Sequence, residues 1–419
     1  MKDSEIIAKL NELLSCAETC SGQLSFGDKK RCAINFSRYV EEIKDYIVFR
    51  IGEEQSQLYS EVFWSIYNKG NIKDNYAIKA VENKLHTFLF ELKIKGSPAT
   101  DRNFSKFFNR LNTAKKEKMT VFHQIYGLDV TDNYPIKMGC FTLYNYHLHK
   151  NEILALTGFQ TEKELLEWHG EFENHDVWIS TEVETVDLDK AYEIACGRFE
   201  VLQGICQFIF DVEGYNAHAV SILSDVQSLY SRCYIVSETQ IKDISESDIR
   251  RFRNANAAVL THDTNHLFIP LMEKVFVPEK SEILNRIRNA FTTYGRILHE
   301  RADTQKFAMY ITTIESLVEY NTSDLTELIA SYLSAMISDS LDSYVATKAD
   351  FKITYNQRSE ISHGSRTNIL KGDLTYAKIY TVELIRKFVT DKEILSFTKN
   401  KELRAHLDSK IKRLEVQGA

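Results

Sequence analysis

The stretch SEILNRIRNAFTTYGRILHE, residues 281–300, predicts an amphipathic helix and opens the part of the chain that decides the fold. Its apolar residues recur at spacings of three and four, which places them on one face of an α-helix. Ser281 stands just before the first of them and suits an amino-terminal cap. The same spacing returns at residues 306–320, 324–345 and 376–388. Helices of this kind must bury their apolar faces against one another, so we expect a C-terminal helical bundle.

The amino-terminal part of the chain also carries helical spacing. It occurs at residues 4–20, 30–68 and 76–95, and the polar stretch SPATDRNFSK after the last of these predicts a loop. We therefore expect an N-terminal helical segment at residues 1–115.

The middle of the chain, residues 119–275, predicts a mixed α/β domain. Strand candidates rich in β-branched and aromatic residues are MTVFHQIYGLDV, PIKMGCFTLYNYHLH, DVWISTEVETVD, HAVSILSD and SRCYIVSETQIKDI. A long helix, DLDKAYEIACGRFEVLQGICQFIF, lies among them with Asp187 or Asp189 as its cap. The expected fold class is therefore mainly α: a helical bundle at 281–419, preceded by this mixed region and by the helical segment.

The composition is that of a folded protein without a membrane span. The chain has 419 residues, of which 43% are hydrophobic and 26% charged, enough for two or three cores. The amino terminus MKDSEIIAKL lacks the basic region and apolar run of a signal peptide. No window approaches the roughly 18 apolar residues of a membrane helix. We expect a cytoplasmic protein with no membrane partner.

The charge distribution bears on partners. The net charge of −7 excludes a globally basic nucleic-acid binder. From residue 281 onward, however, 20 Lys and Arg stand against 18 Asp and Glu, while the preceding residues hold 32 against 41. This asymmetry permits a nucleic-acid partner for the C-terminal part.

The cysteines and histidines do not predict a metal site. The seven cysteines are expected to be reduced and mostly buried, and Cys16, Cys20 and Cys32 lack a fourth ligand nearby. His147 and His149 alternate on an expected strand without a third ligand.

Two further polar clusters and the glycine pattern support no cofactor. HDTNH at 262–266 has no glutamate after its first histidine, so the zinc-protease motif fails. The basic run RRFR at 250–253 is expected to be a solvated helix face. With no phosphate loop and no Rossmann glycine pattern, we predict neither a metal nor a cofactor.

The polar cluster YNQRSEISHGSR, residues 355–366, contains the candidate catalytic residues Arg358 and His363. Gly364 suits the left-handed position that ends a helix, so His363 is expected in the last turn. A histidine gives and takes protons at cellular pH, and the planar guanidinium of an arginine matches a phosphate.

The spacing of this pair favours a dimer. Five positions correspond to about 140° around a helix, so one helix does not aim both groups at one phosphate. Two copies related by a two-fold axis would surround a phosphate with two arginines and two histidines. Such a site supports metal-free RNA cleavage, in which a ribose 2′-hydroxyl attacks the adjacent phosphate and a 2′,3′-cyclic phosphate results.

The cluster and an upstream segment together resemble a known family. RSEISHG at 358–364 resembles the R-x4–6-H signature of HEPN domains, most closely the Apea-like HEPN branch. The segment 286–320 is similar to the opening helix pair of that branch, in which a tyrosine–glycine step precedes a helix that carries a glutamate. Here these are Tyr294–Gly295 and Glu315. The resemblance covers about residues 281–390.

The resemblance implies an all-α HEPN ribonuclease domain that dimerises and acts in prokaryotic anti-phage defence by abortive infection. Arg358 and His363 would be catalytic, and Glu315 would orient Arg358 from the neighbouring helix. Ser359, which would support the site, stands where the wider superfamily often has Asn, Asp or His. The region 119–275 loosely resembles the amino-terminal part of these proteins, and its position predicts a sensing or regulatory role toward a phage-derived trigger.

Two alternatives remain open. The first is a catalytically inactive HEPN module that keeps dimerisation and RNA or nucleotide binding, which the weaker polar group of Ser359 favours. The second is a structural or signalling protein whose helices only assemble and whose helix end at 355–366 is ordinary polar surface.

Overall fold

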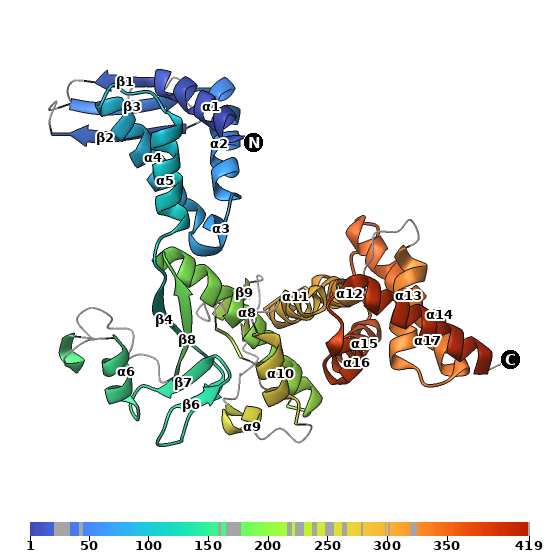
Figure 1. The fold of residues 1–419 in the computed structure, drawn as a ribbon. Helices are drawn as coiled ribbons and strands as arrows, with labels where there is room; N and C mark the ends of the chain where they lie inside the picture. The colour runs from blue at the N-terminus through green and yellow to red at the C-terminus, as the bar shows by residue number, and fades with distance from the viewer. Residues whose placement is uncertain are drawn as a thin grey trace. The chain divides into compact units, whose positions relative to one another are not determined.

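A computed structural model of the chain shows a mainly α protein (Figure 1). It describes residues 1–20, 34–41, 45–157, 161–164, 177–215, 220–222, 230–236, 241–247, 255–261, 266–277, 280–297, 299–300, 302–318 and 325–417. The expected fold class is confirmed. Within these residues, no helix combines the length and the apolar character needed to cross a bilayer.

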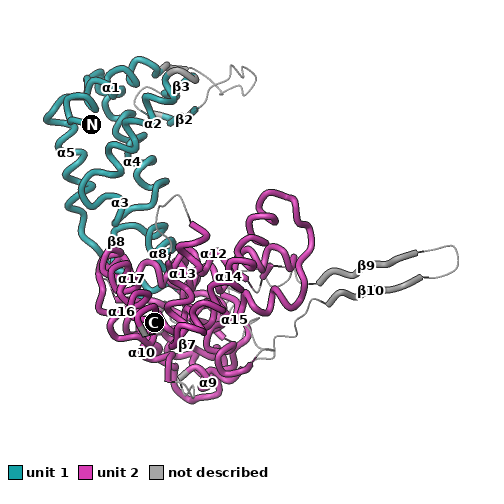
Figure 2. The backbone as a smooth tube through the Cα atoms, turned by 90° about the vertical axis from the view of Figure 1, so that its right-hand side faces the viewer, with its two compact units in different colours: residues 1–121, 182–195 teal, residues 122–181, 196–419 magenta. Residues whose placement is uncertain are grey.

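The chain forms two compact units (Figure 2). Unit 1 comprises residues 1–121 and 182–195, and unit 2 comprises residues 122–181 and 196–419. No boundary between the units falls near residue 281, so most of the predicted mixed domain belongs to the same unit as the C-terminal bundle.

Unit 1 combines helices with a small antiparallel sheet. The sheet has the strand order β1-β3-β2. Its elements are α1 (Asp3–Ser15), β1 (Ala17–Cys20), β2 (Ile34–Val40), β3 (Asp45–Ile51), α2 (Glu53–Tyr67), α3 (Ile72–Asn75), α4 (Ile78–Ile94) and α5 (Asp101–Asn112).

Three expectations for this unit are wrong. The helix expected over residues 4–20 ends at Ser15, and Ala17–Cys20 form β1, paired with β3. The helix expected over residues 30–68 is helical only from Glu53, because the preceding residues form β2 and β3. Val48 and Phe49 of the central strand β3 are both buried, as β-branched and aromatic residues commonly are in strands. The loop expected in SPATDRNFSK ends at Thr100, whose hydroxyl accepts a hydrogen bond from the amide of Asn103 and starts α5.

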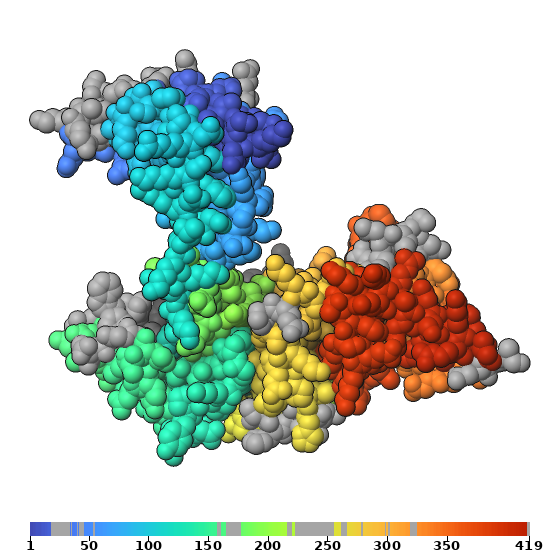
Figure 3. All heavy atoms as spheres, viewed as in Figure 1, coloured from blue at the N-terminus to red at the C-terminus, as the bar shows by residue number. Residues whose placement is uncertain are grey.

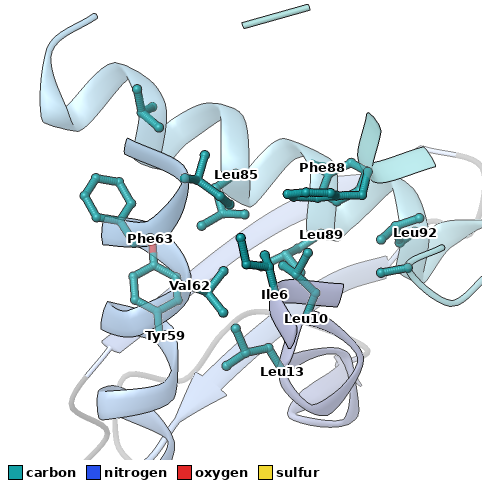
Figure 4. Close-up of a cluster of buried hydrophobic side chains, with 14 of the residues drawn as sticks. Ile6, Leu10, Leu13, Tyr59, Val62, Phe63, Leu85, Phe88, Leu89 and Leu92 are labelled. Atoms are coloured by element: carbon teal, nitrogen blue, oxygen red, sulfur yellow. The ribbon is translucent and has the colours of Figure 1, made fainter. Parts of the chain in front are cut away.

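The core of unit 1 lies between α1, α2 and α4. Figure 4 shows Ile6, Leu10 and Leu13 of α1 together with Val62 of α2 and Leu89 of α4. Each of these side chains is fully buried. At about 25 cal/mol per Å² of apolar surface, such burial is the main source of stability for this unit.

A second sheet follows along the chain, and most of its residues belong to unit 2. The four-stranded sheet has the order β4-β8-β7-β6, with Phe141 opposite Thr181 in the antiparallel pair β7–β8. The left-handed Gly139, with φ +58°, makes the turn between β6 and β7. The elements of this region are β4 (Glu117–Gln124), β5 (Leu128–Asp129), β6 (Ile136–Met138), β7 (Phe141–Asn145), α6 (Lys150–Thr157) and β8 (Val177–Thr185).

A long helix and several short elements follow the sheet. The predicted cap Asp187 accepts a hydrogen bond from the amide of Lys190 at 3.0 Å, at the start of α8. The next strands form an antiparallel hairpin, β9–β10, and a parallel pair, β11–β5. The elements are α8 (Leu188–Val212), β9 (Tyr230–Val236), β10 (Ile241–Ser247), β11 (Ala255–Asn256), α9 (Ala258–Thr261) and α10 (Phe268–Val275).

The C-terminal part of the chain is helical, as the spacing of its apolar residues predicts, but the single helix expected over residues 324–345 is wrong. A helix ends at Ile337 there, and the next begins at Leu341 after the cap Ser340. Ser281 caps the first helix of the bundle by accepting from the amide of Leu284. Helix α12 packs against α11, α14 and α15, and the orange and red atoms of the bundle form one continuous body in Figure 3. Its helices are α11 (Glu282–Ile297), α12 (Asp303–Val318), α13 (Leu325–Ile337), α14 (Leu341–Ser362), α15 (Lys371–Thr390), α16 (Lys392–Ser396) and α17 (Asn400–Gln417).

Two glycines bring the backbones of α8 and α11 together. A Cβ atom on Gly204 would lie 1.9 Å from the carbonyl oxygen of Phe291, and one on Gly295 would lie 2.7 Å from the backbone nitrogen of Gly204. No side chain fits at either position without moving a backbone. This close contact joins the mixed region to the bundle within unit 2.

A buried polar network reinforces the same contact between α8 and α11. Asp211 of α8, whose side chain is 6% exposed, accepts hydrogen bonds from Tyr294 Oη at 2.5 Å and from Lys378 Nζ at 2.6 Å. Burial, followed by the charge of Asp211, raises the pKa of Tyr294 well above its usual value. The tyrosine therefore remains a hydrogen-bond donor, and the network ties α8 to both α11 and α15.

The close contact between α8 and α11 leads to a prediction about stability. Replacing Gly204 by alanine should lower the unfolding free energy of the transition that includes unit 2 by about 2 kcal/mol or more, because the methyl group overlaps the Phe291 backbone. Gly197, on the same helix with open space around it, is the matched control. Gly197→Ala should leave stability unchanged or raise it by about 0.5–1 kcal/mol. Urea unfolding of both variants checks this, and equal effects would contradict it.

Candidate functional site

The candidate site lies at the carboxyl end of α14. His363 is the last residue with near-helical backbone angles, and Gly364 follows with φ +73°. The amide of Gly364 donates to the carbonyl of Ile361, and that of Ser365 donates to the carbonyl of Glu360. This pair of bonds is a Schellman motif. The prediction that Gly364 ends the helix is confirmed.

Arg358 is held by a buried carboxylate on the neighbouring helix. Its Nη2 lies 3.1 Å from Glu315 Oε2 of α12, and the hydroxyl of Tyr355 donates to Glu315 Oε1 at 2.6 Å. Glu315 is only 8% exposed, whereas the Arg358 side chain is 31% exposed. Burial strengthens this charged pair, and part of the Arg358 side chain still reaches solvent.

Helical periodicity explains the position of Arg358. Phe351, Thr354 and Tyr355 are the buried residues of this part of α14, and Arg358 follows one turn later on the same side. Phe351 also packs edge-to-face on Tyr380 of α15, with ring centroids 5.5 Å apart. The apolar contacts of α14 therefore bring Arg358 to α12.

His363 and Ser359 have a different environment. The His363 side chain is exposed and has no polar partner among the described residues. Ser359 is half-buried, and its carbonyl accepts the amide of His363 at 3.0 Å. The structure thus brings Glu315 and Arg358 together, and it leaves His363 free at the helix end, about 140° around the axis from Arg358.

The segment after the helix is fixed by a second ion pair. Arg366 Nη1 lies 3.3 Å from Glu360 Oε2, and the hydroxyl of Ser365 donates to the Glu360 carbonyl at 2.9 Å. The backbone on both sides of His363 is therefore held by hydrogen bonds. An exposed imidazole on a fixed backbone can exchange protons with a molecule that docks there.

Sequence reasoning missed Tyr355, Glu360 and Arg366. Tyr355 belongs to the apolar stripe of α14, and no local pattern in the sequence shows that its hydroxyl meets Glu315 of α12. Glu360 and Arg366 were visible as opposite charges. Their pairing depends on the sharp reversal of the chain at Gly364.

The other polar clusters do not form a metal site within the described residues, which contain no group of three His, Cys, Asp or Glu suited to a metal ion. The strand expected through His147 and His149 is wrong, because β7 ends at Asn145. His149 is fully buried; its Nδ1 accepts from the amide of Asn145, and its Nε2 lies 3.0 Å from the Asp132 carbonyl. The stretches 250–253 and 262–265 lie outside the described residues.

Comparison with protein-family models, with curated proteins and with solved structures finds no match for this chain. The HEPN resemblance therefore stays a prediction that rests on the motif residues.

The hydrogen bond from Tyr355 to the buried carboxylate of Glu315 leads to a prediction about stability. Tyr355→Phe removes one of two hydrogen bonds to Glu315, so the unfolding free energy should fall by about 1–2 kcal/mol. Tyr376 on α15 is 59% exposed and serves as the matched control. Tyr376→Phe should change stability by less than about 0.5 kcal/mol. Urea unfolding followed by circular dichroism compares the two, and a neutral Tyr355→Phe would contradict this role of Glu315.

Proposed function

We propose that this chain is a metal-independent endoribonuclease of the Apea-like HEPN type. The observation that carries the proposal is the ion pair between Glu315 and Arg358, next to an exposed His363 on a fixed helix end. Glu315 was expected to orient Arg358 from the neighbouring helix, and the two side chains lie 3.1 Å apart. Arg358 is partly exposed and is held in place by Glu315, so it suits the binding of a phosphate in a defined orientation.

The reaction uses proton transfer and charge stabilisation. His363 accepts the proton of a ribose 2′-hydroxyl, whose oxygen attacks the adjacent phosphorus. Arg358 stabilises the negative charge that develops on the phosphoryl oxygens. A second acid, His363 of another copy, protonates the departing 5′-oxygen. The products are a 2′,3′-cyclic phosphate and a 5′-hydroxyl, and DNA does not react because it lacks the 2′-hydroxyl.

A homodimer completes this site. In one chain, Arg358 and His363 point about 140° apart around α14. Two copies of the helix end, related by a two-fold axis, supply an acid and a base on opposite sides of one phosphate. The acid and the base then come from different chains, which the chemistry requires because one histidine cannot do both in the same step.

In the cell, we place this activity in the cytoplasm, in anti-phage defence by abortive infection. A phage-derived trigger would act through the region at 119–275, and cleavage of RNA would halt growth of the infected cell. The motif residues and the order of the regions support this part of the proposal.

RNA cleavage in EDTA tests the catalytic residues. Arg358→Ala and His363→Ala should each lower the cleavage rate at least about 100-fold, because each removes a group that acts on the transition state. Arg404→Ala, on the exposed face of α17, is the charge-matched control and should cleave like the wild type. The wild-type products should carry 2′,3′-cyclic phosphates.

The same assay separates the alternatives. Equal cleavage by all variants would rule out this site. RNA binding without cleavage, also in cells challenged with phage, would indicate the inactive binding module that Ser359 favours.

Protein concentration tests the dimer. If the site needs two chains, cleavage per chain should fall as the protein is diluted below its dimer dissociation constant. Analytical ultracentrifugation gives that constant. The protein concentration at which the cleavage rate per chain falls to half should agree with it. A rate per chain that stays constant while the dimer dissociates would contradict a shared site.

A further inference from the structure

A cavity in unit 1 lies between α4 and α5. Its volume is about 520 Å³, within the range of small-molecule sites. It is lined by residues of both helices and of the turn between them, from Tyr76 to Leu111. All of these belong to unit 1, so the cavity does not depend on how the two units are placed.

One wall of the cavity is apolar. Phe88 of α4 and Phe107 of α5 stack with ring centroids 4.5 Å apart and an interplanar angle of 14°. Leu92 and Leu111 extend this wall and are almost fully buried. Figure 4 shows Phe88 and Leu92 on α4, at one end of the hydrophobic cluster of unit 1. Because Phe107 is only half-buried, the wall offers surface to a planar ring.

Four cationic side chains line the same cavity: Lys84, Lys95, Lys106 and Arg110. None of them has an ion-pair partner among the residues that the structure describes. Lys84 lies over the ring of Tyr76, 5.4 Å from its centroid. Elsewhere in unit 1 lysines do pair with carboxylates, as Lys9 does with Glu61. The cavity therefore carries an excess of positive charge that no ion pair of the described residues neutralises.

Three neutral polar side chains of the cavity already have hydrogen-bond partners, and one of them is Ser97, whose hydroxyl donates to the Lys95 carbonyl at 3.3 Å. The Thr87 hydroxyl donates to the Asn83 carbonyl at 2.9 Å, and the Asn103 amide donates to the Pro98 carbonyl at 2.9 Å. Glu91 is the one carboxylate that lines the cavity, and it has no partner within the described parts of the chain. The charged groups left for a ligand are thus four cations and one carboxylate, and an apolar wall lies beside them.

We propose that this cavity binds a nucleotide. The phosphate would lie among the cations, the base against the Phe107 side of the apolar wall, and a ribose hydroxyl or base amino group would donate to Glu91. Inorganic phosphate would leave both the apolar wall and Glu91 unused. The site is separate from Arg358 and His363 and does not rest on the proposed nuclease activity.

Calorimetry on the full chain tests this site, with AMP, GMP, CMP and UMP as probes and with adenosine and inorganic phosphate as partial probes. At least one nucleotide should bind at least ten times more tightly than adenosine or phosphate, because only the nucleotide uses both the cations and the wall. Lys84→Gln and Lys106→Gln should each weaken binding about three- to tenfold. Raising the salt concentration should weaken it further.

The matched controls are Lys79→Gln on α4 and Arg102→Gln on α5, which are exposed cations on the same helices outside the cavity. They should bind like the wild type. Absence of nucleotide binding, equal loss in the control variants, or unchanged binding in Lys84→Gln and Lys106→Gln would each overturn the proposal. None of these outcomes depends on RNA cleavage, so they leave the nuclease proposal to its own test.

Discussion

The close approach of α8 and α11 at Gly204 and Gly295 is the constraint on which most of unit 2 depends. Backbone meets backbone there, because a Cβ on Gly204 would lie 1.9 Å from the Phe291 carbonyl oxygen. The contact sets the position of α11, and α12 packs on α11 in turn. Asp211 adds polar bonds to α11 and α15 at the same contact. A buried ion pair of this kind repays the cost of desolvation only when its geometry is good and further hydrogen bonds satisfy it, and Tyr294 supplies such a bond to Asp211.

The candidate site follows from this packing. Helix α12 carries Glu315 among mostly apolar buried residues. Tyr355 and Arg358 of α14 both donate hydrogen bonds to its carboxylate. A buried carboxylate costs free energy unless it is hydrogen-bonded and paired, and here both of its oxygens have partners. The arginine keeps a solvent-exposed part, so its charge remains usable for an external anion.

The two proposals rest on opposite electrostatic situations. At the helix end, one arginine is largely compensated by Glu315, which favours a precise orientation over strong attraction. In the cavity of unit 1, four cations without ion pairs and a single carboxylate lie beside an apolar wall, which favours binding of an anion with a planar ring. In the proposed nuclease, the helix end would orient an RNA phosphate between two copies of the chain. The cavity suits retention of a small ligand.

The sequence by itself determined the helical bundle, its cap at Ser281, the stop at Gly364 and the cap at Asp187, because these depend on local spacing and on short-range hydrogen bonds. It did not determine the strands at 34–40 and 45–51, whose apolar residues also match a helical spacing and whose state depends on pairing with each other and with β1. Only the tertiary structure decided that Gly204 meets Gly295 and that Tyr355 shares Glu315 with Arg358. These contacts join residues 40 or more positions apart, and no local pattern encodes which distant backbone or carboxylate a residue will meet.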